Sequence, residues 1–175
     1  MGAINKMKYN KHPGIYTIDH FTCDDCPAKL FNNGDKIIYK GIGNINSRTM
    51  IILPYYISIN KKKFTEIIDI IVEEYKKRYR RDLFESNYIT PVIKCFCDNV
   101  QYDIKNTVFS KCAIKTISEL SIHKYHSVII FLGDSSEIDI MIPNNLHKIN
   151  INCPFTIFDN DADKQIFLDE LFKYI

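Results

Sequence analysis

The clearest pattern of apolar and polar positions lies in residues 62–81. The apolar residues recur at steps of three and four, which places them on one side of an α-helix. These positions are Phe64, Ile67, Ile68, Ile71, Val72, Tyr75 and Tyr79. Charged residues fill most of the other positions, and the basic ones concentrate at the C-terminal end, where the helix dipole favours cations. We therefore expect a central amphipathic helix that packs its apolar stripe against a sheet.

Strands are expected on both sides of this helix. Residues 49–59 are apolar and β-branched, and Pro54 inside them favours an edge strand or a bulge. Residues 89–97 alternate between two faces, as a strand does. The apolar run at 126–132 predicts a buried strand, and the alternating segment 137–142 is expected to pair with it as a hairpin.

The last third of the chain adds a further strand at 149–158, interrupted by Pro154. Residues 108–120 are ambiguous, but their apolar spacing favours a short helix. Residues 161–174 predict an amphipathic C-terminal helix, with Asp159 or Asp161 as its N-cap. The stripe of this helix contains Phe167, Leu168, Leu171 and Phe172.

These elements together predict an α+β fold, because helices and consecutive strands occur in separate runs. The sheet should be largely antiparallel or mixed, and it should pack against the helices at 62–81 and 161–174. Residues 1–14 are interpreted as a flexible N-terminal arm and residues 15–175 as a single domain. No repeat, low-complexity tract or linker divides the chain, and 175 residues are enough for a substantial core.

Composition narrows the classes of function. A net charge of +2 provides no global attraction to nucleic acid, so any basic surface must be local. Ile, Asn, Lys, Tyr and Phe are abundant and Trp is absent, a codon bias that fits a virus or an AT-rich microbe. The first residues lack the apolar segment of a signal peptide, and no apolar run is long enough to span a bilayer. We therefore expect a cytoplasmic protein without a membrane partner.

The cysteines suggest one metal site. Cys23 and Cys26 have the spacing of a zinc knuckle, in which one turn brings two thiolates to one ion. Cys95 and Cys97, two apart on an expected strand, would face one side and could complete the ligand set. The alternative is that these cysteines are small apolar core residues. Zinc is the cofactor that these four cysteines suggest, but the interpretation as structural core residues is favoured.

A second candidate is acidic. Glu137 and Asp139, two apart on an expected strand, point the same way and could bind a divalent cation, with Asp159 as a third carboxylate. Such a site would serve nucleotidyl transfer or nuclease chemistry. However, the upstream glycine-serine turn and helix of nucleotidyltransferases are missing. The lysine that usually accompanies such carboxylates in metal-dependent nucleases is missing as well. Because Glu137 and Asp139 alternate with isoleucines, we favour the simpler interpretation that these two carboxylates lie on the solvent-exposed face of a strand.

Residues 159–170 also resemble the start of a calcium loop, with carboxylates at alternate positions and Glu170 at the bidentate position. Lys164 stands where such a loop needs glycine for its sharp turn. A cation there strains the backbone and repels the ion. We therefore expect these acidic residues to cap an ordinary helix or to lie in its first turn, without a bound calcium ion.

The basic run at the end of the central helix is the third candidate. It could line phosphates, with neighbouring tyrosines stacking on bases. Its members are Lys76, Lys77, Arg78, Arg80 and Arg81. Because the same helix carries four acids and its tyrosines belong to the apolar stripe, a solvated helix face is the favoured interpretation.

No catalytic constellation is recognisable in this sequence. The leading hypothesis is therefore a small intracellular protein that acts without catalysis by contact with another protein, as an assembly or regulatory subunit. A nucleic-acid-binding module using the basic end of helix 62–81 is one alternative. A metal-dependent enzyme built on Glu137, Asp139 and Asp159 is the other.

Overall fold

The computed structural model describes residues 41–44, 46–53, 61–94, 105–122, 128–133, 142 and 144–175. Its strands form a five-stranded sheet in the order β1-β3-β2-β4-β5. The strands are β1 (Ile42–Gly43), β2 (Thr49–Leu53), β3 (Asn87–Pro91), β4 (Val128–Leu132) and β5 (His147–Ile151). Neighbours among β2 to β5 pair in parallel, and only β1 is antiparallel, to β3. The sheet is therefore mixed.

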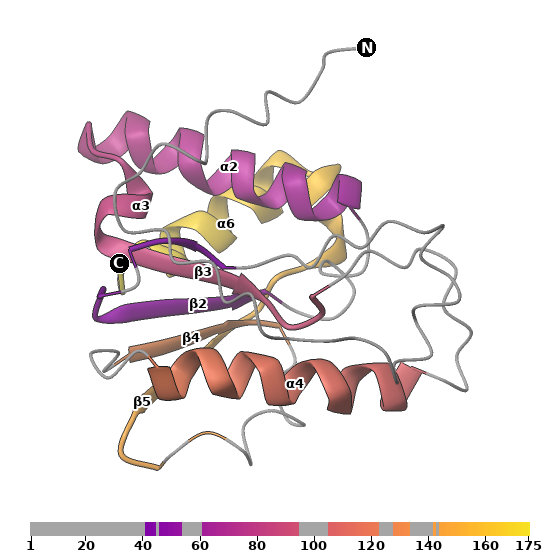
Figure 1. Cartoon of the computed structure of the whole chain (residues 1–175). Coiled ribbons are helices and arrows are strands. Elements are labelled where there is room, and N and C mark those ends of the chain that lie inside the picture. The colour runs from indigo at the N-terminus through magenta and orange to yellow at the C-terminus, as the bar shows by residue number, and fades with distance from the viewer. Residues whose placement is uncertain are drawn as a thin grey trace.

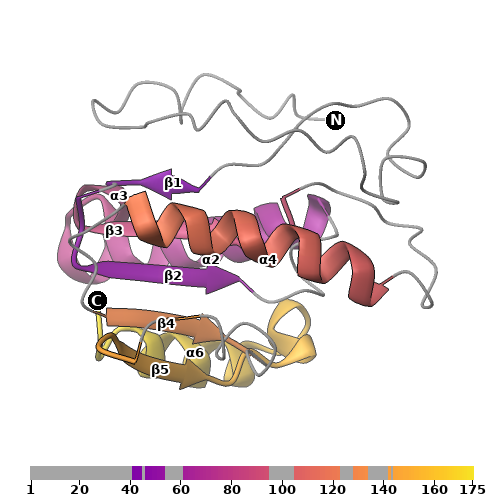
Figure 2. The same ribbon diagram turned by 60° about the horizontal axis from the view of Figure 1, so that its bottom comes forward.

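Helices cover both faces of this sheet (Figures 1 and 2). They are α2 (Lys61–Tyr79), α3 (Leu83–Ser86), α4 (Lys105–Ile122), the 3-10 helix η3 (Phe155–Phe158) and α6 (Asp161–Leu171). α2 and α6 lie on one face, and α4 lies on the other. The described residues thus form a single α+β domain, as the sequence predicts.

The central strand β2 explains why the core has two halves. All five of its residues are buried. Ile51 and Leu53 belong to the core under α2 and α6, while Met50 and Ile52 belong to the core under α4. A parallel strand covered on both faces has no polar side, which is why its sequence is a continuous apolar run rather than an alternating one.

The expected stripe of α2 is confirmed. Phe64, Ile67, Ile68, Ile71 and Tyr75 are all buried against the sheet and α6. At the end of the helix Tyr79 is 42% exposed, and its hydroxyl donates to the carbonyl of Phe172 at 3.4 Å. The long apolar face thus determines how α2 is placed, because its burial is the main favourable term available to an isolated amphipathic helix.

Two expectations about strand pairing are wrong. β2 is not an edge strand: it has β3 on one side and β4 on the other, and it ends at Leu53, directly before Pro54. β4 is not one arm of a hairpin, because β2 and β5 pair with it in parallel on both sides. The expected second arm, residues 137–142, lies outside the described residues except for Ile142. The physical reason is the parallel topology, in which partners come from distant segments rather than from the next turn.

Helical boundaries also differ in the last two thirds of the chain. The ambiguous segment 108–120 lies in the eighteen-residue helix α4. The strand expected at 149–158 ends at Ile151, and η3 follows Pro154. The N-cap of α6 is Asn160, whose side chain accepts hydrogen bonds from the amides of Ala162 and Asp163, so neither expected aspartate is the cap.

The short strand β1 depends on glycine. Gly43 has a φ of +113°, and a Cβ there would lie 2.2 Å from the carbonyl oxygen of Asn87. A side chain would therefore both strain the backbone and push β1 away from β3. The amide of Asn44 donates to the same Asn87 oxygen, at 3.0 Å, and so fixes how the chain enters the sheet.

In the part of the chain described here, no helix has the length and apolar character that crossing a membrane requires.

Candidate functional site: the carboxyl edge and the buried ion pair beneath it

The parallel strands define two edges of the sheet. We call the edge at which β2, β3, β4 and β5 end the carboxyl edge, marked by Leu53, Pro91, Leu132 and Ile151. The opposite edge, where they begin, is the amino edge, marked by Thr49, Asn87, Val128 and His147. α2, α4 and α6 return across the sheet, so each begins at the carboxyl edge and ends toward the amino edge (Figure 1).

The strand order reverses between β2 and β4. From β2 the chain runs through α2 to β3 on one side, and from β4 it continues to β5 on the other side. The two strands are direct neighbours, so the reversal lies between two adjacent carboxyl ends, at Leu53 and Leu132. In open sheets of this kind, ligands bind in the crevice outside the carboxyl ends, at the point where the order reverses.

Backbone hydrogen bonds hold the ends of the strands together at this edge. The amide of Val92 donates to the carbonyl of Leu53, at 3.1 Å, and the amide of Gly133 donates to the carbonyl of Ile151, at 2.8 Å. Gly133 has a φ of +97°, in the region that favours glycine. The chain therefore leaves β4 through a backbone conformation that a side chain would strain.

Just beneath this edge, on the α4 face, three polar side chains form a buried network. Lys94 Nζ donates to Glu119 Oε2 at 2.9 Å and to the hydroxyl oxygen of Thr90. The Thr90 hydroxyl donates to the same carboxylate oxygen, at 2.6 Å. Lys94 and Glu119 are 1% and 3% exposed, and Thr90 is fully buried. The network joins the end of β3 to the last turn of α4.

Burial dominates the electrostatics of this network. It lowers the pKa of Lys94 from its ordinary value, because the charged ammonium loses hydration, and the negative charge of Glu119 opposes that shift. The pKa of the nearby Tyr88 hydroxyl is raised, first by burial and then by the charge of Glu119. These perturbed groups, with one specific charge partner between them, mark the network as a candidate functional feature.

The surroundings of the network are mixed in polarity. Lys115, Thr116 and Cys112 are buried on the same helix, α4. The hydroxyl of Thr116 is fully buried and has no hydrogen-bond partner among the described residues. Native protein interiors contain few buried polar groups without a hydrogen bond, because removing such a group from water costs free energy. Stability alone therefore does not account for the polarity of this half of the core.

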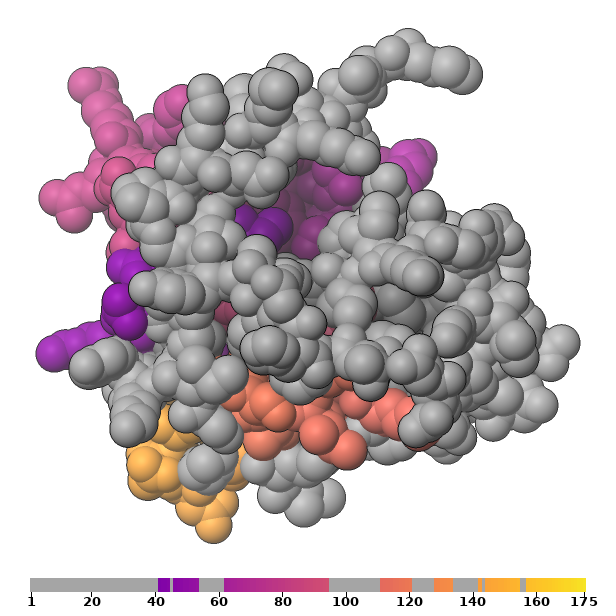
Figure 3. All heavy atoms as spheres, viewed as in Figure 1, coloured from indigo at the N-terminus to yellow at the C-terminus, as the bar shows by residue number. Residues whose placement is uncertain are grey.

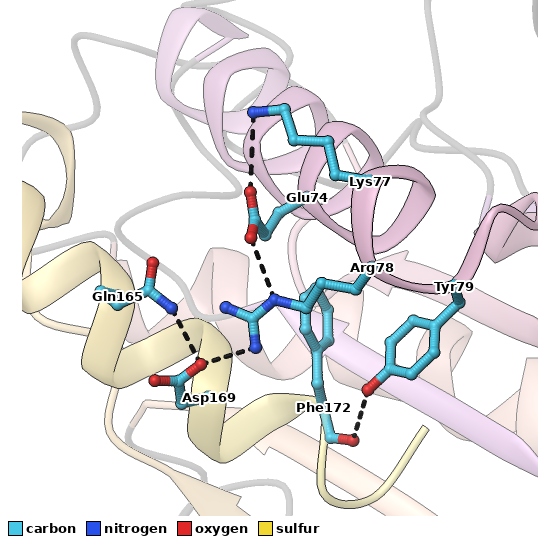
Figure 4. Close-up of polar contacts among 7 residues, drawn as sticks. All are labelled: Glu74, Lys77, Arg78, Tyr79, Gln165, Asp169 and Phe172. Carbon is cyan, nitrogen blue, oxygen red and sulfur yellow. Dashed lines mark hydrogen bonds and ion pairs between the residues drawn. The ribbon is translucent and has the colours of Figure 1, made fainter.

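A second polar contact joins α2 to α6, as Figure 4 shows. Arg78 Nη1 lies 2.6 Å from Asp169 Oδ1, and Arg78 Nε lies 3.0 Å from Glu74 Oε1. The guanidinium of Arg78 also stacks over the ring of Phe172, at 5.0 Å from its centroid. Hydrogen bonds from Arg78 are the largest cause of the lowered pKa of both carboxyls. The contact is structural, because it holds the ends of two helices together.

That contact bears on the basic run predicted as a nucleic-acid surface. Arg78 is engaged with α6, and Lys77 forms an ion pair with Glu74 at 3.6 Å. Lys76, Arg80 and Arg81 are exposed at the end of α2. This end lies at the amino edge, where its side chains project from the body of the molecule (Figure 3). Binding of nucleic acid by these residues stays a prediction.

The acidic candidates are only partly described. Glu137 and Asp139 lie outside the described residues, so their approach to Asp159 is untested. Asp159 itself is exposed between η3 and α6. Within the described ranges, no three His, Cys, Asp or Glu side chains are grouped so that they could hold a metal ion. In the segment that resembles a calcium loop, Lys164 pairs with Asp161, and Asn160 serves as the helix cap.

The proposed zinc ligands Cys23, Cys26, Cys95 and Cys97 also lie outside the described residues. Cys112 and Cys153 are described, and both are buried. They belong to opposite halves of the core, Cys112 under α4 and Cys153 under α2 and α6. These two cysteines therefore behave as apolar core residues, and the zinc site stays a prediction.

Sequence reasoning missed the buried network. Lys94 stands within the apolar segment 89–97, and a lysine at a buried strand position was the available signal. Glu119 lies in the segment whose helical pattern is ambiguous. Nothing local connects the two residues, which are separated by 25 positions.

The fold and site together define a class: an α+β domain with a mixed sheet, helices on both faces and a reversal of strand order at its carboxyl edge. Beyond that class, the chain matches no protein-family model, and no curated protein is similar to it in sequence.

Proposed function

We propose that the protein binds a small ligand at the carboxyl edge of its sheet, between the ends of β2 and β4. The observation that carries this proposal is the reversal of strand order at that point. Ligands of open doubly wound sheets bind outside the carboxyl ends of the strands at such a reversal. Topology alone assigns the ligand a place but not a chemistry.

The helices support an anionic ligand. α2 and α4 both begin at this edge, and neither has an acidic residue in its first turn. The positive ends of their dipoles favour negative charge. Lys62 and Lys63 in the first turn of α2 add to that preference, whereas Asp161 and Asp163 in the first turn of α6 oppose it. We therefore expect the ligand on the side of α2 and α4, with a phosphate or carboxylate group.

Methyl-resolved NMR with a diverse fragment library, including phosphate-bearing fragments, tests this proposal. Methyl groups of Leu53, Leu132 and Ile151 report on the carboxyl edge, and those of Leu83 and Val128 report on the amino edge. Fragments should shift the first set at concentrations that leave the second set unchanged. Shifts confined to the amino edge, or no fragment that perturbs the carboxyl edge, would contradict the proposal.

Contact with another protein, the leading hypothesis from the sequence, stays a prediction. The large apolar side chains exposed in the described ranges are Tyr79, Ile114, Ile166 and Tyr174. They come from α2, α4, α6 and the C-terminal segment, and Tyr79 contacts Phe172, two residues before Tyr174. The native mass of the purified protein is the direct test of this function. A metal-dependent reaction at Glu137, Asp139 and Asp159 likewise stays a prediction.

A further inference from the structure

The position of Lys94 is unusual for a lysine. It lies three residues beyond the end of β3, next to the carboxyl edge, yet its side chain is only 2% exposed. A lysine near an edge can normally keep its ammonium in water while its stem covers apolar surface. Here the ammonium returns instead to Thr90, four residues earlier, and to Glu119 on α4. Taking both charges out of water costs several kcal/mol per ion before their attraction is counted.

The segment 92–94 is held from three directions. The amide of Val92 bonds to the end of β2, the side chains of Val92 and Ile93 belong to the core under α4, and the ammonium of Lys94 bonds to α4 itself. Apolar contact alone tolerates several arrangements of a chain end. A charge-assisted hydrogen bond is directional, so it selects one of them.

Stability does not require this pair to be charged. Replacing a buried ion pair by apolar residues of similar volume is often neutral or stabilising, whereas removing one partner is strongly destabilising. The hydroxyl of Thr116, one turn before Glu119, likewise gains no hydrogen bond within the described part of the chain. A charged pair that stability does not demand, placed directly beneath the carboxyl edge, needs another explanation.

We propose that Lys94 and Glu119 are positioning residues: their buried ion pair fixes the end of β3 against β2 and so shapes the ligand site at the carboxyl edge. This inference rests on the proposed function for the ligand, but its structural part can be measured independently. Thr90 completes the device, because its hydroxyl bonds to both charged partners and aligns them on the strand.

The first test compares Lys94→Met, Glu119→Leu and the double variant by thermal unfolding and by amide hydrogen exchange. Each single variant should lower Tm, and the double variant should recover most of the loss. Despite that recovery, the Val92 amide should exchange at least about tenfold faster in the double variant, because local opening no longer breaks an ion pair. Wild-type exchange at Val92 in a double variant of wild-type stability would overturn the inference.

If the double variant does not fold, a pair of matched variants tests whether the ion pair fixes the end of β3. Thr90→Val and Thr116→Val are the same near-isosteric change at two fully buried positions on facing elements. Thr90→Val removes a hydroxyl that contacts both charges, so Val92 exchange should rise. Thr116→Val removes a hydroxyl without a partner, so exchange should stay unchanged. Equal exchange rates in the two variants would remove the positioning role.

The fragment titration separates this inference from the proposed function. If fragments shift the methyl groups of Leu53 and Leu132 in the wild type, their affinity should fall at least about tenfold in the stable double variant. Unchanged affinity would overturn the positioning role and leave the ligand site standing. If no fragment binds this edge in the wild type, the proposed function fails, and Val92 exchange alone still decides whether the pair fixes the chain.

Discussion

Replacing Ile71 by alanine should strongly destabilise the protein. Ile71 is fully buried on α2, inside the core half that α2 shares with α6. Ile-to-Ala changes in cores cost about 2–5 kcal/mol, from lost transfer free energy and from the cavity left behind. We expect about 3 kcal/mol, because strands and α6 enclose the site and can collapse only partly. The fall in Tm should be about 6–12 °C for a chain of this length.

Ile166→Ala is the matched control. Ile166 is also helical, on α6, but it is 66% exposed. Alanine has the higher helix propensity at both sites, so this small gain cancels in the comparison. The control should change the free energy of unfolding by no more than about 0.5 kcal/mol. Urea unfolding followed by circular dichroism measures both variants, and a cost below 1 kcal/mol at Ile71, or equal costs at both sites, would refute the packing derived for α2.

Four further outcomes are expected. Arg78→Met should lower the free energy of unfolding near neutral pH and flatten its decline on acidification. The two carboxyls that Arg78 contacts have a lowered pKa in the folded state, so their contribution is present above their ordinary values of 4.5 and 3.8 and is lost as pH falls through the folded pKa. Urea unfolding measured from about pH 3 to pH 7, which spans the titration of carboxyl groups, checks this expectation. Parallel curves of unfolding free energy against pH for the variant and the wild type would contradict it. Arg80 has a φ of 55° just after α2, so Arg80→Gly should stabilise the protein by about 1 kcal/mol, whereas Arg80→Ala, which keeps a Cβ, should not. Asn160→Ala should cost about 1 kcal/mol through loss of the α6 cap, and Asn160→Asp should retain most of that stability; no difference between the two variants would show that the cap is unimportant. If the basic end of α2 binds nucleic acid, Lys76→Glu with Arg81→Glu should weaken retention of DNA and reduce its salt dependence while leaving Arg78 in place, and wild-type protein that shows no retention at low salt would end that hypothesis.

The accuracy of sequence reasoning followed the strength of the local pattern. The stripe of α2 is unmixed, so its length and buried side could be read directly. In α4 the buried side also includes Lys115, Thr116 and Glu119, and these polar residues obscured the helical period. The strand β4 was expected from its apolar run, but an apolar run does not specify a partner. Parallel pairing depends on crossovers, whereas the prediction of a hairpin assumed that adjacent segments pair.

The candidate site was less accessible to prediction for the same reason. Its defining feature, the reversal of strand order between β2 and β4, is a property of the whole topology and has no local signature. The ion pair beneath it joins a strand end to a helix 25 residues later. Only Lys94 gave a local signal, because a lysine inside an apolar strand segment must be either exposed or paired.

The parallel pairing of β2 with β4 constrains the order in which the chain can fold. Along the chain, α2, β3 and α4 come between β2 and β4, so the contact between these two strands closes a long loop. Topologies rich in such long-range contacts fold slowly. During synthesis from the N-terminus, β2 and β3 can pair early, but the other side of β2 stays open until residue 132 has emerged from the ribosome. An apolar strand with one unpaired side invites association with other chains. We expect nascent chains that stop between residues 94 and 128 to aggregate or to recruit chaperones, and chains extended beyond β4 to escape that fate.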